Sequence, residues 1–114
     1  RAFPIKGDSM PPLKEGCFVI GKFMESVKDI KDGNTYVLLT RDDGIVYKRV
    51  YKKGKLLELH SDNKQYEPYQ VKTADVLELW EFVCTLNISD KKTEELNIDS
   101  IIRMLNSMRV EMGQ

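Results

Sequence analysis

Residues 35–60 read TYVLLTRDDGIVYKRVYKKGKLLELH, and they contain three short runs rich in valine, isoleucine, leucine and tyrosine. The runs cover 35–41, 44–51 and 55–60, and the turn signals RDDG and KKGK separate them. Glycine beside aspartate or lysine favours a tight turn, whereas β-branched and aromatic residues favour extended backbone. This stretch therefore predicts consecutive antiparallel strands joined by short turns.

The same pattern continues on both sides. CFVIGKF at 17–23 and VLELWEFVCTLNI at 76–88 predict further strands, while KDGN at 31–34 and SDNK at 61–64 predict further turns. Turn signals that recur about every ten residues favour an antiparallel meander or barrel over βαβ units. We therefore expect a mainly β domain with a strongly bent antiparallel sheet over residues 1–88.

The end of the chain has a helical pattern instead. Asn97 or Ser100 can cap the start of a helix and Gly113 marks its end. The apolar residues follow at helical spacing: Ile98, Ile101, Ile102, Leu105, Met108 and Met112. Residues 89–114 are thus expected to be a linker and a C-terminal amphipathic α-helix. Its apolar stripe packs either on its own β domain or on a second copy, and we expect the second copy and a homodimer.

Composition limits the classes of function. The 114 residues carry 18 basic and 18 acidic side chains, so the net charge is zero, and this argues against nucleic-acid binding by this segment itself. No apolar run approaches the roughly 18 residues of a membrane span. Cys17, Cys84 and the single histidine, His60, lack metal-ligand spacing, so we expect no metal and no cofactor. Reduced thiols favour a cytoplasmic protein. The chain begins with Arg1 rather than methionine, and we expect a fragment or a processed product.

One short motif places a serine at a tight corner. The sequence PIKGDSMPP at 4–12 sets Ser9 after a glycine and an aspartate and before two prolines. Gly7 and Asp8 are turn formers, and the prolines stop regular structure nearby. A serine hydroxyl becomes a nucleophile only when a base takes its proton. His60 is one candidate base, but no carboxylate that would orient it is evident. A neutral lysine is the other.

Lys48 is the lysine best placed for burial, because most others lie in predicted turns. It lies inside IVYKRVY, where strand alternation puts it on one face with Val46 and Val50. Burial in apolar surroundings can lower the pKa of a lysine by about 3–5 units. An inward-pointing lysine that blocks an edge strand is the more ordinary interpretation of the pattern alone. A serine in a Gly-Asp-Ser turn is likewise most often a turn residue.

Taken together, the two motifs resemble the LexA-like serine/lysine peptidases, the C-terminal domains of LexA, CI-type phage repressors and UmuD. GDSMPP and Gly16 are followed by Tyr47-Lys48-Arg49 on a second strand, and then by LLELHSDNKQYEP at 56–68. The resemblance covers residues 4–79 in the family's order. Two positions differ from the family pattern: Cys17 stands where an acidic residue is usual, and Tyr47 where valine is commoner.

The resemblance implies a LexA-like fold with Ser9 as nucleophile and Lys48 as general base. The backbone N–H groups of Ser9 and Met10 would hold the oxyanion. It further implies self-cleavage in the upstream linker of a helix-turn-helix repressor of the SOS-response type. Neither the linker nor the DNA-binding domain is in these residues, so DNA would be bound only through a preceding domain.

Three other functions remain open. The fold can serve as a dimerisation or sensor module with an idle Ser/Lys pair. It can belong to a UmuD-like mutagenesis accessory protein without a DNA-binding domain. It can also be part of a signal peptidase, although the membrane anchor that such an enzyme needs is not visible here.

Overall fold

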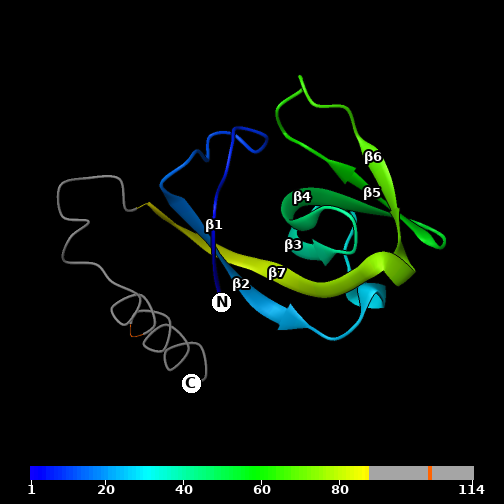
Figure 1. Cartoon of the computed structure of the whole chain (residues 1–114). Helices are drawn as coiled ribbons and strands as arrows, with labels where there is room; N and C mark the ends of the chain where they lie inside the picture. Colours follow the sequence, from blue (N-terminus) through cyan, green and yellow to red (C-terminus); the bar gives the residue numbers. More distant parts are fainter. Residues whose placement is uncertain (88–102, 104–114) are drawn as a thin grey trace.

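The computed structural model of the chain describes residues 1–87 and Arg103 (Figure 1). Within this part of the chain there are seven β-strands and two short 3₁₀-helices. The strands are β1 (Ala2–Pro4), β2 (Cys17–Met24), β3 (Thr35–Thr40), β4 (Gly44–Lys53), β5 (Leu56–His60), β6 (Tyr69–Lys72) and β7 (Val76–Asn87). The 3₁₀-helices are η1 (Val27–Asp29) and η2 (Thr73–Asp75).

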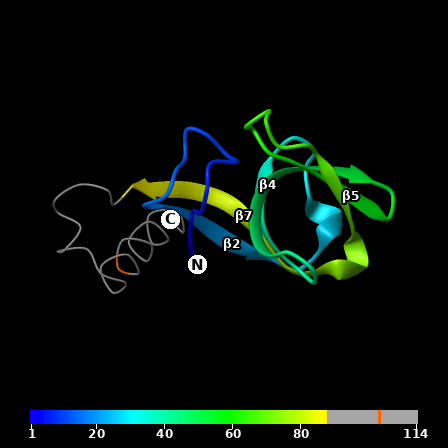
Figure 2. The ribbon, with the colours of Figure 1, turned by 45° about the horizontal axis from the view of Figure 1, so that its top comes forward.

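All seven strands form one antiparallel sheet in the order β1-β2-β7-β3-β4-β5-β6. The last strand, β7, lies between β2 and β3, so strands far apart in the chain become neighbours. The sheet curls on itself, and β4, β5 and β7 surround its interior (Figure 2). The predicted bent antiparallel β fold is therefore confirmed.

Short turns set the register of the central hairpins. Gly44 and Gly54 have positive φ angles of 70° and 63°, which side chains with a Cβ rarely adopt. Only Gly54 and Lys55 separate β4 from β5, so Lys53 pairs with Leu56 and Arg49 pairs with His60. This tight connection brings the end of β5 beside the middle of β4.

The curled sheet encloses its main core. Leu38, Val50 and Leu59 are fully buried there, and partly buried side chains such as Val46 pack against them. Full burial of such side chains stabilises the fold by about 1.5–3 kcal/mol each. A second cluster of Phe3, Val19 and Val37 joins β1, β2 and β3, with Tyr47 and Trp80 packed against it.

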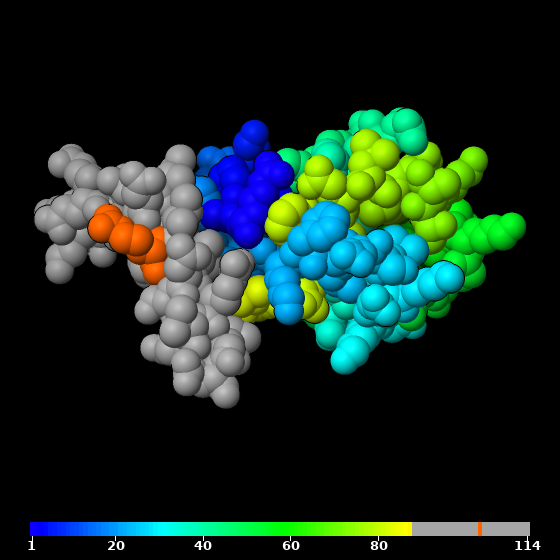
Figure 3. Space-filling model, turned by 90° about the horizontal axis from the view of Figure 1, so that it is seen from below, coloured from blue at the N-terminus to red at the C-terminus, as the bar shows by residue number. Residues whose placement is uncertain are grey.

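The pairing of β2 with β7 forms an arm that extends from the curled part. A β-bulge lies between Ile20 and Gly21, where the Cβ of any larger residue at position 21 would come within 2.9 Å of the Trp80 Cβ. Trp80 makes edge-to-face contacts with Phe3 and Phe23, at centroid distances of 5.3 Å and 5.2 Å. The N-terminal segment lies against these two strands in the space-filling view (Figure 3).

The strand predictions agree with the structure to within a few residues at each end. Strands β1 and β6, which are only 3 and 4 residues long, were not predicted from the sequence. The predicted C-terminal helix lies outside the described residues except for Arg103, whose backbone is helical. It therefore stays a prediction, as does the domain boundary after residue 88.

Candidate functional site

Ser9 lies in the turn between β1 and β2, as predicted. Its side chain is half-buried, and the neighbouring Met10 is 4% exposed. Gly7 opens the turn with a φ of 75°, and the Leu13 N–H donates to the Met10 carbonyl at 3.0 Å. The buried methionine and this local hydrogen bond fix the backbone on both sides of the serine.

Lys48 lies in the middle of β4, between β3 and β5 in the sheet. Val50 on the same face is buried in the main core and Val46 packs against it, so Lys48 projects from the core-facing side. The lysine is half-buried, and its Nζ donates to the Ser61 Oγ at 2.7 Å. Burial lowers the pKa of Lys48 below its ordinary value, although the negative charge of Asp43 partly opposes this.

The loop of residues 61–66, which follows β5, reaches both of these places. At one end, Ser61 accepts the hydrogen bond from Lys48. Further along, the Asn63 N–H donates to the Ser9 carbonyl at 2.9 Å, and its side-chain Nδ2 donates to the Asp8 carbonyl at 3.0 Å. The Tyr66 hydroxyl donates to the Asp8 carboxylate at 2.5 Å. A single loop therefore ties the serine turn to the lysine strand.

Ser9 and Lys48, the two residues predicted to form the dyad, both contact the loop of residues 61–66 but do not bond to each other. Among residues 1–87, the Ser9 hydroxyl and the Lys48 amine form no hydrogen bond with each other. Lys48 Nζ lies instead against Ser61 and 5.9 Å from the centre of the Tyr66 ring.

A cleft of about 540 Å³ leads along β4 to Lys48. Its walls are residues 1–6 on one side and 43–48 on the other, with Val19 and Val37 between them. Within the described residues, β1 pairs only with β2, and residues 44–48 pair only with β3 because β5 begins pairing at Arg49. Each wall thus has one backbone edge that pairs with no other strand of residues 1–87.

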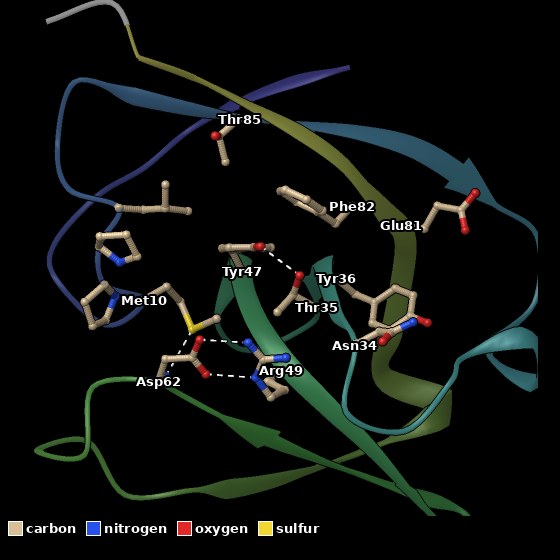
Figure 4. A pocket seen from close by; sticks show the side chains of 13 residues that line it. Met10, Asn34, Thr35, Tyr36, Tyr47, Arg49, Asp62, Glu81, Phe82 and Thr85 are labelled. Atoms are coloured by element: carbon tan, nitrogen blue, oxygen red, sulfur yellow. Dashed lines mark hydrogen bonds and ion pairs between the residues drawn. The ribbon is translucent and has the colours of Figure 1, made fainter. Parts of the chain in front are cut away.

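The opposite side of β4 faces a second cavity, of about 620 Å³ (Figure 4). There Arg49 and Asp62 point toward one another and form two hydrogen bonds of 2.9 Å. The Asp62 N–H donates to the Met10 sulfur at 3.2 Å, and Tyr47 donates to Thr35 at 2.8 Å. Neighbouring residues on a strand point to opposite faces, so Arg49 and Lys48 lie on opposite faces of β4. The Arg49–Asp62 pair therefore holds β4 from the face that does not carry Lys48.

The Arg49–Asp62 pair also shifts the proton equilibria of both partners. Its hydrogen bonds lower the pKa of the Asp62 carboxyl below its usual value and raise that of the Arg49 guanidinium. Both groups therefore stay charged at neutral pH, and the pair links β4 to the loop throughout the physiological range.

His60 has a carboxylate partner that was not predicted from the sequence. Its Nε2 lies 2.6 Å from Glu58 Oε1, two residues earlier on the same strand, and its ring meets Tyr51 edge to face. Strand alternation predicts that neighbours two apart share a face, so this partner was available from the sequence. Among the described residues, no hydrogen bond or ion pair joins His60 to Ser9.

No group of three or more potential metal-ligating side chains occurs within residues 1–87 and Arg103. Cys17 and Cys84 are both free thiols. None of the described helices has the length and apolar character required to cross a bilayer.

Ser61 was missed as a neighbour of Lys48, although a signal for it exists. The two-residue connection between β4 and β5 pairs Arg49 with His60, and the next pair in that register is Lys48 with Ser61. Cross-strand partners share a face and bring their side chains together. The register follows from the length of the turn. The sequence KKGK predicts a turn but does not show that only two residues form it.

Comparisons with known proteins identify the family of this domain. Residues 1–83 match the family described as Peptidase S24-like, and this range includes the Ser9 turn, Lys48 and the loop of residues 61–66. None of the curated proteins compared with the chain matches it significantly. Because the family match covers most of the chain, the protein belongs to the Peptidase S24-like family and contains a LexA-like serine peptidase domain.

Proposed function

We propose that this chain is the self-cleavage and dimerisation domain of a LexA- or CI-like transcriptional repressor. The observation that carries the proposal is the half-buried Lys48, whose amine has a lowered pKa and lies beside the loop that holds the Ser9 turn. Burial favours the neutral amine that a lysine base requires. The family match supports peptidase chemistry at these residues.

In the proposed reaction, the Lys48 lone pair takes the hydroxyl proton of Ser9 as Oγ forms a bond to a peptide carbonyl carbon. The electron pair of the carbonyl double bond moves to its oxygen. When this tetrahedral intermediate collapses, the peptide C–N bond breaks and the Lys48 ammonium returns the proton to the leaving amine. Water then hydrolyses the acyl-serine, with Lys48 as base again.

Backbone N–H groups of Ser9 and Met10 would stabilise the oxyanion. Among residues 1–87, neither N–H donates to another protein group, which supports this role. A tight turn with two successive N–H groups not used in the sheet is the arrangement that such an oxyanion site requires.

The cleft suggests how a substrate would approach. An extended peptide can pair with the open edges of β1 and of residues 44–48, as a strand added between them. In the proposed function, this peptide is the protein's own linker upstream of the domain. The same proposal gives the intact protein a preceding DNA-binding domain, a cytoplasmic location and a second copy as partner.

A second candidate is an idle dimerisation or sensor module. The Lys48–Ser61 hydrogen bond favours it, since the amine is bonded to a residue other than Ser9. The two candidates differ in whether cleavage occurs at all.

Single substitutions in the full-length protein test the proposal. Ser9→Ala and Lys48→Ala should each abolish self-cleavage on a denaturing gel at alkaline pH, while circular dichroism and the melting temperature stay close to wild type. Lys22→Ala removes an exposed lysine outside the site and should cleave at the wild-type rate. Cleavage that survives either substitution at the dyad would refute the Ser/Lys mechanism. Absence of cleavage in the wild type under all conditions would favour the idle module.

A further inference from the structure

The loop of residues 61–66 makes contacts that a simple connection between β5 and β6 does not require. It bonds to Lys48 through Ser61, to the Ser9 carbonyl through the Asn63 N–H, and to Asp8 through Asn63 and Tyr66. These partners lie 13 or more residues away along the chain. The contacts of the loop therefore fall on both segments that carry the dyad.

Ser61 is the member that touches the amine itself. A neutral lysine has two N–H donors and one lone pair, and a hydrogen bond to Ser61 Oγ at 2.7 Å uses one donor. Because the amine nitrogen is tetrahedral, fixing one N–H restricts the directions that the lone pair can take. A serine hydroxyl oxygen can accept from the ammonium as well as from the neutral amine, so the same contact is possible before and after a proton transfer.

Tyr66 lies between Lys48 and the Ser9 turn. Its ring centre lies 5.9 Å from Lys48 Nζ, while its hydroxyl donates to the carboxylate of Asp8, the residue before the nucleophile. The hydrogen bond to Asp8 raises the pKa of the Tyr66 hydroxyl, which favours its protonated, donating form.

We propose that residues 61–66 are the positioning element of the dyad, in which Ser61 orients the Lys48 amine toward Ser9 and Tyr66 holds the Ser9 turn in place. The inference rests on the proposed function, since it assigns roles toward the same reaction. Ser61 and Tyr66 act through Lys48 and Asp8, and neither takes part in bond formation.

The main test compares Ser61→Ala with Ser61→Thr in the full-length protein. Ser61→Ala should reduce the alkaline plateau of the cleavage rate roughly tenfold or more, because the base is no longer oriented. The inflection of the pH profile should also move to lower pH, because the Lys48 ammonium loses an acceptor that stabilises it. Ser61→Thr keeps the hydroxyl and should restore both the plateau and the inflection.

Other charged and titratable groups near Lys48 also affect its pKa, so the test requires that they are unchanged in these variants. They are Asp43 in the turn before β4, Arg1 and Lys6 on the opposite wall of the cleft, and Tyr66 and the Asp62–Arg49 pair beside the loop. None is altered by the substitutions at Ser61, so a moved inflection reports the lost hydrogen bond.

Tyr66→Phe separates the two halves of the proposal. It keeps the ring beside Lys48 but removes the hydroxyl that binds Asp8, so it should lower the plateau and leave the inflection unchanged. Tyr51→Phe and Ser26→Ala are matched controls that remove hydroxyls elsewhere. Both should cleave as wild type.

A measurement that does not depend on cleavage distinguishes failure of this inference from failure of the proposed function. Nuclear magnetic resonance of the ¹³C-labelled lysine ε-carbon in the 114-residue chain follows the titration of Lys48, with Lys48→Met identifying its signal. A lower pKa in Ser61→Ala, restored in Ser61→Thr, supports the assigned contact even if the wild type proves not to cleave. Unchanged titration together with an unchanged cleavage plateau in Ser61→Ala would overturn the inference while the Ser9 and Lys48 substitutions still test the proposed function.

Discussion

At the scale of single residues, the site depends on one lysine whose environment differs from that of the other lysines in residues 1–87. Lys48 shares a strand face with Val46 and Val50 and bonds to Ser61, whereas the neighbouring Lys52 and Lys53 are exposed. Removal of an amine from water disfavours its charged form. The chemistry proposed for this domain thus follows from the burial of one side chain.

The pH dependence of cleavage should report that burial. Because the pKa of Lys48 is lowered, the rate should rise with pH and level off below the pH at which an ordinary lysine titrates. Between the folded and unfolded pKa values the unfolded chain binds more protons, so the free energy of unfolding also rises with pH. Rate profiles and pH-dependent denaturation of wild type and Lys48→Met measure both effects. A flat rate profile from mildly acidic to alkaline pH would exclude Lys48 as the base.

A second residue-scale prediction concerns the Arg49–Asp62 pair. Arg49→Lys should lower the free energy of unfolding by about 0.5–1 kcal/mol, since lysine cannot reproduce two parallel bonds to one carboxylate. Asp62 has a lowered pKa, so this contribution is present at neutral pH and is lost as the pH falls through that pKa. Arg41→Lys is the control, because its pair with Asp75 is longer, at 3.3 Å, and the arginine is 61% exposed. Urea denaturation at pH 7 and in acid compares them, and equal losses at neutral pH would contradict the prediction.

At the scale of elements, the two-residue turn between β4 and β5 determines which side chains meet. It sets the register that places Ser61 beside Lys48 and Asp62 within reach of Arg49. A shift of one residue would turn every β5 side chain to the other face. The loop after β5 therefore depends on a turn some distance away along the chain.

The β2–β7 arm gives an element-scale prediction. Gly21→Ala should destabilise the fold by about 1–3 kcal/mol, because its Cβ would lie 2.9 Å from the Trp80 Cβ and 3.4 Å from the Phe3 ring. The Trp80 Cβ is attached directly to the β7 backbone and cannot move aside cheaply. Lys22→Ala, at the next and exposed position, should stay within about 0.5 kcal/mol of wild type. Thermal denaturation distinguishes the two, and equal melting temperatures would show that the arm adjusts without strain.

At the scale of the whole molecule, the chain combines a β domain with a tail that the structure does not describe. The β domain contains its own core, which the seven strands of residues 1–87 enclose. The tail carries six apolar residues at helical spacing. A helix of this length is marginal alone in water, so we expect the stripe to be buried against a second copy.

Deletion of residues 97–114 tests that expectation. The intact chain should sediment as a dimer, and the truncated chain should dissociate at concentrations at least tenfold higher than those at which the intact dimer does. The circular dichroism signal of the β domain should remain in both. Equal dissociation constants would place the dimer contact on the β domain and the helix on its own subunit.

Much of the β architecture could be predicted from local patterns. Alternating apolar residues and turn-forming glycines determine where strands begin and end, because these effects act within a few residues. The serine motif and the lysine strand could likewise be recognised from the chain alone. Short strands such as β1 and β6 could not, because their few residues carry little pattern and they form by pairing with β2 and β5.

Only the tertiary structure decided which residues surround Lys48 and Ser9. The position of β7 between β2 and β3, the burial of Lys48 and the contact of residues 61–66 with the Ser9 turn all join segments distant in the sequence. Composition and periodicity describe neighbours along the chain, whereas these contacts depend on sheet order, register and curl. The sequence alone therefore determined the residue types of the site and the positions of the longer strands, whereas the packing of the sheet determined how the site is arranged.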